Sequence, residues 1–181
     1  MQRKIRKAKL KSRSLELELN DTFETEGGPI TNEVIMKCAG LTHDDLRTAF
    51  SRLALHMIMI CDLRKAEMIN NETFEKDDLS DFEDYTVTGF SIGGEDENEG
   101  AVIIGSRKFK SGKVLNITTP FTKFSDENNP YEFEDALYND LQACIYEVEL
   151  YLEGKYAVKQ LELPFDEEVL DEEMVLHEAS M

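Results

Sequence analysis

The stretch Thr86 to Ile92 reads TVTGFSI and begins the part of the chain that decides the fold. Its residues favour strands, and successive side chains should alternate, with Val87 on one face and Phe90 on the other. Two more segments rich in strand-forming residues follow closely, so strands are expected at residues 86–92, 101–109 and 114–119. The dipeptide Ser111-Gly112 lies between the last two and favours a tight turn. The pattern predicts an antiparallel meander.

A further strand is expected nearer the N-terminus. Leu15, Leu17 and Leu19 alternate with polar residues, which is the period of a half-buried strand. The cluster Gly27-Gly28-Pro29 then favours a loop. Residues 30–38 suit either a short helix or a strand, and we favour the helix.

Two long helices complete the expected elements. The first begins at the N-cap Thr42, with Asp44 and Asp45 in its first turn where they favour the helix dipole. Its second half is apolar on most sides and should be deeply buried. The second helix begins near Pro130 and ends near Gly154, with apolar residues recurring at intervals of three and four.

These elements predict an α+β domain in which an antiparallel sheet of about four strands packs against two main helices. A length of 181 residues with 41% hydrophobic content suits a single domain with tails. We expect a basic N-terminal arm at residues 1–13, the α+β domain at residues 14–158, and an acidic C-terminal tail at residues 159–181. No internal repeat is evident.

The formal net charge of −18 indicates a surface that repels nucleic acid and anionic membranes. The basic residues are uneven, because seven of the 20 lie in the first 13 positions. Three widely spaced cysteines are typical of free thiols in a reducing compartment, and no apolar run reaches transmembrane length. We expect a cytoplasmic protein without a membrane partner.

One basic cluster lies in the expected hairpin turn between the last two strands. Its members are Arg107, Lys108, Phe109, Lys110 and Lys113. Cations beside an aromatic ring favour weak contact with nucleic acid, and single-stranded DNA would suit a ring that can stack on a base. The alternative is that these cations protect an exposed edge from aggregation.

The sequence offers no pattern typical of catalysis. His43, His56 and His177 do not lie near a serine or cysteine in a recognisable arrangement, and zinc-ligand spacing is absent. The acidic residues 95–99 lack the ligand order of a calcium loop. We therefore expect no catalytic residue, no metal site, no cofactor and no enzymatic activity.

The hexapeptide Gln160 to Phe165, which reads QLELPF, follows the last expected helix. It resembles the peptide Gln-Leu-x-Leu-x-Leu/Phe by which bacterial replication and repair proteins bind the DNA polymerase sliding clamp. The resemblance implies that Gln160 hydrogen-bonds at one subsite, that Leu163 and Phe165 fill an apolar pocket, and that Leu161 supports them. An ordinary terminal strand would show the same alternation.

These features favour a non-enzymatic accessory protein of bacterial or phage DNA replication, recombination or repair. It would be recruited to the sliding clamp and would touch DNA weakly. The alternative is an acidic inhibitor that imitates DNA and binds a DNA-handling enzyme, as phage anti-defence proteins do.

Overall fold

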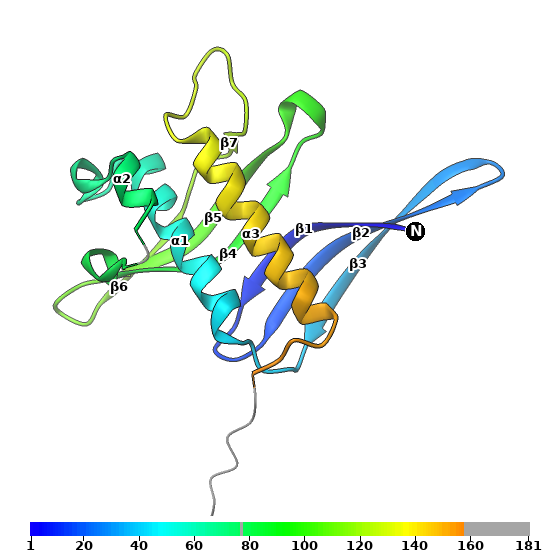
Figure 1. Cartoon of the computed structure of the whole chain (residues 1–181), viewed down its shortest axis with the longest axis horizontal. Helices are drawn as coiled ribbons and strands as arrows, with labels where there is room; N and C mark the ends of the chain where they lie inside the picture. Colours follow the sequence, from blue (N-terminus) through cyan, green and yellow to red (C-terminus); the bar gives the residue numbers. More distant parts are fainter. Residues whose placement is uncertain (77, 158–181) are drawn as a thin grey trace, which may run out of the picture.

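The structure is a computed structural model that describes residues 1–76 and 78–157. One antiparallel sheet is covered on a single face by two long helices (Figure 1). The strands are β1 (Gln2–Leu10), β2 (Leu15–Thr25), β3 (Gly28–Cys38), β4 (Tyr85–Gly93), β5 (Gly100–Lys108), β6 (Val114–Thr118) and β7 (Thr122–Lys123). The α-helices are α1 (Asp44–Ile60), the short α2 (Asn71–Phe74) and α3 (Glu134–Leu152).

The sheet order is β3-β2-β1-β4-β5-β6, with β7 beside one end of β5. The chain therefore contains two similar runs, each with three main antiparallel strands followed by a long helix. We call residues 2–60 the first half and residues 85–152 the second half. The opening strands β1 and β4 lie side by side in the centre, and each half extends outward from them to its own edge strand. This repeat of topology has no counterpart in the sequence.

The two halves join over a short ladder. Only Lys7, Ala8 and Lys9 of β1 pair with β4, opposite Ser91, Phe90 and Gly89. A Cβ atom on Gly89 would lie 2.9 Å from the carbonyl oxygen of Ala8, so the close approach requires glycine at this position.

The predicted antiparallel sheet and two main helices are confirmed, but the expected number of strands is too small. Residues 1–13, expected as an arm outside the domain, contribute the central strand β1 instead. Its cations lie beside acids of β2, with Arg3 Nε 2.8 Å from Asp21 and Lys7 Nζ 2.7 Å from Glu18. Cross-strand pairing thus replaces the solvated arm.

The helix favoured for residues 30–38 is wrong, because β3 covers this segment. β3 pairs with the whole of β2, from Leu15 opposite Cys38 to Thr25 opposite Gly28. Pairing along the full length of β2 thus decides a segment whose local pattern suits either a helix or a strand.

The expected alternation along β4 is also wrong. Pairing with β5 shifts register between Val87 and Gly89, which marks a β-bulge. The extra residue turns both Val87 and Phe90 toward the helices, where they are 4% and 0% exposed.

The core lies between the sheet and the helices. Six consecutive residues of α1, from Leu53 to Ile58, are buried, as the sequence predicts. The sheet and α3 cover two sides of α1, and the segment between α1 and β4 adds the buried Phe74 and Phe82. Within the described residues, no helix has both the length and the apolar character that a membrane span requires.

Candidate functional site

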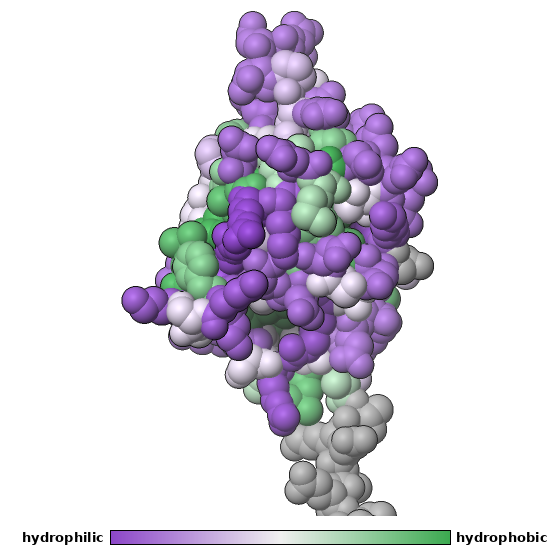
Figure 2. Space-filling view, turned by 90° about the vertical axis from the view of Figure 1, so that its left-hand side faces the viewer, coloured by the Kyte–Doolittle hydropathy of each residue, from purple (hydrophilic) through white to green (hydrophobic). Residues whose placement is uncertain are grey.

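The end of β5 and the turn that follows it carry all five residues predicted to contact nucleic acid. Phe109 and Lys113 close the turn through a 2.8 Å bond from the Phe109 N–H to the Lys113 carbonyl. Gly112 has φ +80°, a conformation that glycine adopts without strain. The side chains of Lys108, Lys110 and Lys113 are exposed. Figure 2 views the molecule from the side on which α2 and this turn lie in Figure 1, and hydrophilic residues predominate there.

Arg107 differs from the three lysines because the fold already uses its charge. Its Nε atom lies 3.0 Å from the carboxylate of Asp84, and its guanidinium lies over the rings of Tyr85 and Phe109. Phe109 is 39% exposed, so its ring is only partly available to a base. The turn therefore presents three exposed lysines, whereas Arg107 anchors its base.

The predicted clamp-binding residues Gln160, Leu161, Leu163 and Phe165 lie outside the described residues. The last part of the chain that the structure describes leaves α3 and returns to the loop before α1. The Ala157 N–H bonds to the Leu41 carbonyl at 3.0 Å, and the Tyr151 hydroxyl bonds to the Gly40 carbonyl at 2.6 Å. These contacts hold the last described residues beside the loop that precedes α1.

A buried polar network links α1 to α3. His56, which is 0% exposed, lies with Nε2 3.1 Å from Asp140 and with Nδ1 3.0 Å from the Tyr131 hydroxyl. Arg52 donates to the other Asp140 oxygen at 2.9 Å and to the Phe74 carbonyl. The network therefore joins both helices to the segments that precede α3 and follow α1.

The network contains an acid, a histidine and a hydroxyl, but its chemistry is that of a structural link. Burial lowers the pKa of His56, which keeps the imidazole neutral. Burial acts to raise the pKa of Asp140, but bonds from His56 and Arg52 outweigh it and leave the pKa lowered. Nε2–H then donates to Asp140, and Nδ1 accepts from Tyr131.

The Tyr131 hydroxyl and the nearby Cys144 thiol are not activated as nucleophiles. Burial raises the pKa of Tyr131, so this hydroxyl keeps its proton. Cys144 lies one turn beyond Asp140 and is fully buried, and burial likewise raises the pKa of its thiol.

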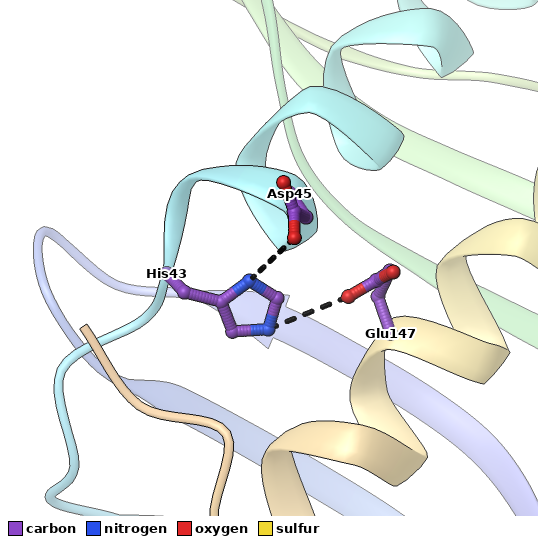
Figure 3. A group of neighbouring side chains, drawn as sticks. All are labelled: His43, Asp45 and Glu147. Carbon is purple, nitrogen blue, oxygen red and sulfur yellow. Dashed lines mark ion pairs between the residues drawn. The ribbon is translucent and has the colours of Figure 1, made fainter.

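A second cluster of polar side chains links the N-terminus of α1 to α3. His43, Asp45 and Glu147 have side-chain ligand atoms within 4.8 Å of one another (Figure 3). The His43 Nδ1 atom accepts the Leu46 N–H at 3.3 Å and so caps the helix. Its Nε2 atom lies 3.5 Å from Glu147 and has no hydrogen-bond partner by strict geometry within the described residues.

The spacing suits a metal, but the bonding does not. The Lys155 ammonium lies 2.7 Å from Asp45 and 2.8 Å from Glu147, and these carboxylates raise its pKa. A cation is therefore already present between the two acids. Because the cap uses the lone pair of Nδ1, Nε2 carries the proton of the neutral ring and has no lone pair for a metal. We interpret the cluster as a clasp between the two helices.

The described surface has hollows, but their lining does not suit a small molecule. One of about 290 Å³ is open to solvent and is lined mainly by polar residues of the uncovered sheet face, including Lys7, Glu18 and Glu33. Sites for small molecules are usually more enclosed and more apolar. This hollow does not indicate a substrate site.

No protein-family model matches the chain, and no curated protein or solved structure matches it. The sequence does not predict the buried network, but one residue of α3 indicates it. Asp140 lies in the apolar stripe of α3, where a charge requires a buried partner.

Proposed function

We propose that the chain is a non-enzymatic accessory protein of bacterial or phage DNA replication, recombination or repair. It docks on the sliding clamp through Gln160, Leu161, Leu163 and Phe165. The observation that carries the proposal is the sequence of this peptide, in which a glutamine precedes alternating large apolar residues. The proline at position 164 favours extended backbone at Leu163 and lowers the ordering cost of binding.

The geometry of the last described residues supports this arrangement. The bond between Ala157 and Leu41 anchors the chain beside the start of α1, and Gln160 follows only three residues later. A clamp bound to the peptide would thus lie near one end of the domain. The domain would be held close to the DNA that the clamp encircles.

The basic turn supplies the proposed DNA contact. Lys108, Lys110 and Lys113 are exposed and have no ion pair within the described residues. Three such cations suit weak, sequence-independent contact with phosphates, and Phe109 adds a partly exposed ring. Tethering to the clamp would offset the weakness of this contact by raising the local concentration of DNA.

Calorimetric titration of a purified bacterial sliding clamp tests the docking step. The full chain should bind with a Kd of about 1 μM, which is typical of a short peptide with few anchors. Changing Gln160, Leu163 and Phe165 to alanine should abolish the heat. The matched control is Glu162→Ala, which leaves the apolar residues in place and should bind normally. No heat from the intact chain would refute the proposal.

Anisotropy of a labelled single-stranded oligonucleotide tests the DNA contact separately. Replacing Lys108, Lys110 and Lys113 with alanine should weaken binding and should reduce the slope of log K against log salt concentration by up to about 2, since each phosphate contact on a single strand contributes about 0.7. The control variant Lys123→Ala removes a cation on β7, at the opposite end of β5 from the turn. If the turn variant and the control bind DNA equally, the turn is not the contact.

The second candidate is an inhibitor that imitates DNA. Much of the N-terminal positive charge is consumed by ion pairs, including Arg3 with Asp21 and Lys4 with Glu99. Acidic side chains elsewhere, such as those at residues 95–97, are exposed at the surface. This hypothesis requires that the chain displace a labelled duplex from a basic DNA-handling enzyme and that it bind neither clamp nor DNA.

A further inference from the structure

Strand β3 forms one edge of the sheet and leaves its outer backbone groups without partners in the described residues. It spans Gly28–Cys38 and pairs only with β2. Most of its side chains are exposed, and Ile35 is 75% exposed. A long and regular edge of this kind is a template for pairing with another strand.

Pro29 shows which residues of β3 direct their backbone groups outward. Pro29 pairs with Glu24 and has no N–H, so this pair cannot exchange ladder hydrogen bonds. The β2–β3 register continues unshifted to Cys38. Hydrogen-bonded and non-bonded pairs alternate in an antiparallel ladder. Thr31, Glu33, Ile35 and Lys37 therefore turn their N–H and C=O groups to the open edge.

The same residues form a self-complementary pattern on the uncovered face of the sheet. Glu33, Ile35 and Lys37 follow one another at alternate positions, with opposite charges on either side of an apolar residue. When this edge meets a second copy about a two-fold axis at Ile35, Glu33 lies opposite Lys37 of that copy, and Ile35 lies opposite Ile35. Each charged residue then faces its opposite.

The face toward the helices matches in the same register. Val34 lies opposite Met36 of the second copy, and both residues are half-buried in the single chain. Cys38 lies opposite Asn32. The register thus satisfies three conditions together: backbone groups that face each other, opposite charges that pair, and apolar side chains that meet.

We propose that β3 is a homodimer interface in which two copies pair antiparallel about Ile35 and form one continuous sheet of twelve main strands. The second copy is the favoured partner because charge reversal along β3 complements itself under two-fold symmetry. An unrelated strand would have to supply the same charge order by chance. This inference is independent of clamp binding.

Disulfide trapping in the full chain tests the register. In a hydrogen-bonded antiparallel pair the Cα atoms are about 5.5 Å apart, which a disulfide spans. Ile35→Cys should therefore form a covalent dimer under mild oxidation. Glu33→Cys alone and Lys37→Cys alone should not, but a mixture of these two variants should cross-link. The unmodified chain, which keeps its native cysteines, measures the background cross-linking. Cys38 should contribute little to it, since Cys38 faces Asn32 and not a second cysteine across the interface.

Light scattering with size-exclusion chromatography tests the dimer itself. The experiment should use physiological salt, because a charge of −18 on each copy opposes association at low ionic strength. The unmodified chain should be dimeric at concentrations on the order of 100 μM. Ile35→Lys should be monomeric, because it places two like charges at the centre of the interface. Its fold is checked by circular dichroism.

A charge swap distinguishes a specific loss of pairing between two β3 strands from a general loss of solubility. Glu33→Lys should weaken the dimer at least tenfold by placing lysines opposite one another, and the double variant Glu33→Lys/Lys37→Glu should recover it. A monomeric unmodified chain would overturn the proposal. So would a dimer that survives Ile35→Lys, or cross-linking of Glu33→Cys alone as efficient as that of Ile35→Cys.

Discussion

The first and second halves of the domain share an order of three main strands and a helix, yet they use it differently. α1 of the first half is buried over six consecutive residues, whereas α3 of the second half buries residues mainly at intervals of three and four. The difference follows from position. The segment between α1 and β4 packs Phe74 against His56 and so covers α1 on a side that α3 leaves open (Figure 1).

The uncovered faces of the two half-sheets also differ. In the first half, ion pairs such as Lys7 with Glu18 and Lys11 with Glu16 cross this face. In the second half, the corresponding residues are uncharged and half-buried. They include Thr88, Ser91, Val102, Ile104 and Ser106.

The edges differ most. β3 has eleven residues and a self-complementary charge order, whereas β6 has five residues beside a turn rich in lysine. Lysine near an edge discourages strand pairing. The comparison indicates that one topology can carry a core helix and an association edge in one half, and an amphipathic helix and a protected edge in the other.

The largest expected effect comes from breaking the network that joins the halves. Asp140→Ala leaves Arg52 and His56 without their acid and should lower the free energy of unfolding by about 3–5 kcal/mol. Chemical denaturation measures this loss. Gln142→Ala on the exposed side of α3 is the control and should change stability by less than about 0.5 kcal/mol. A loss no greater than in the control would mean that the network does not bind the halves together.

The joint between β1 and β4 should be the next most sensitive position. In Gly89→Ala the new methyl group must displace backbone at Ala8, which should cost about 1–3 kcal/mol. Gly27→Ala at the β2–β3 tip meets only one atom, at 3.9 Å, and serves as the control. The melting temperature in thermal unfolding measures the effect. Equal melting temperatures for both variants and the unmodified chain would contradict the account.

The pH dependence of stability tests whether burial lowers the pKa of His56 in the folded chain. Because its pKa is lower in the folded state, the unfolded chain binds more protons as the pH falls below about 6.5, the unperturbed histidine value. Stability should therefore be full above this pH and should fall below it by at most about 1.4 kcal/mol per pH unit for one proton. The pKa of Asp140 is also lowered, so its contribution is lost only at more acidic pH. His56→Gln should flatten the first decline in denaturation curves recorded between pH 5 and 7.

The smallest expected effect concerns the N-terminal cap, which differs between the two long helices. α1 is capped by the His43 side chain, whereas α3 has no side-chain cap at Phe133. His43→Ala should cost about 1 kcal/mol, and His43→Asn should recover most of it because asparagine also caps. Equal losses in denaturation would show that the contact with Glu147, rather than the cap, carries the stabilisation.

The sequence predicts the regular parts of this fold and misses those where regularity is interrupted. The long helices follow from clear periodicity. The meander follows from its strand-forming residues and turn signals, although the bulge in β4 breaks the expected alternation. β1 is concealed because its bulge between Ile5 and Lys7 places the buried Ile5 and Ala8 three residues apart rather than two. β3 is ambiguous because Val34, Ile35 and Met36 are all apolar, although Ile35 points to solvent.

The candidate sites show the same limit. The exposure of the turn lysines follows from local sequence, because a tight turn between strands lies at the surface. The capture of Arg107 by Asp84 depends on a residue 23 positions away, and the network depends on a contact between His56 and Asp140 at a separation of 84. Such pairs form only once the strands and helices have packed, so no local pattern contains them.

Amide hydrogen exchange tests most directly whether the edge strand β3 pairs with a second copy of the chain. If β3 pairs with a second copy, the N–H groups of Glu33, Ile35 and Lys37 should exchange as slowly as those of Val34 and Met36, which bond to β2. Ile35→Lys should restore fast exchange at Glu33 and Lys37. Alternating fast and slow exchange along β3 in the unmodified chain, at concentrations on the order of 100 μM, would contradict the account.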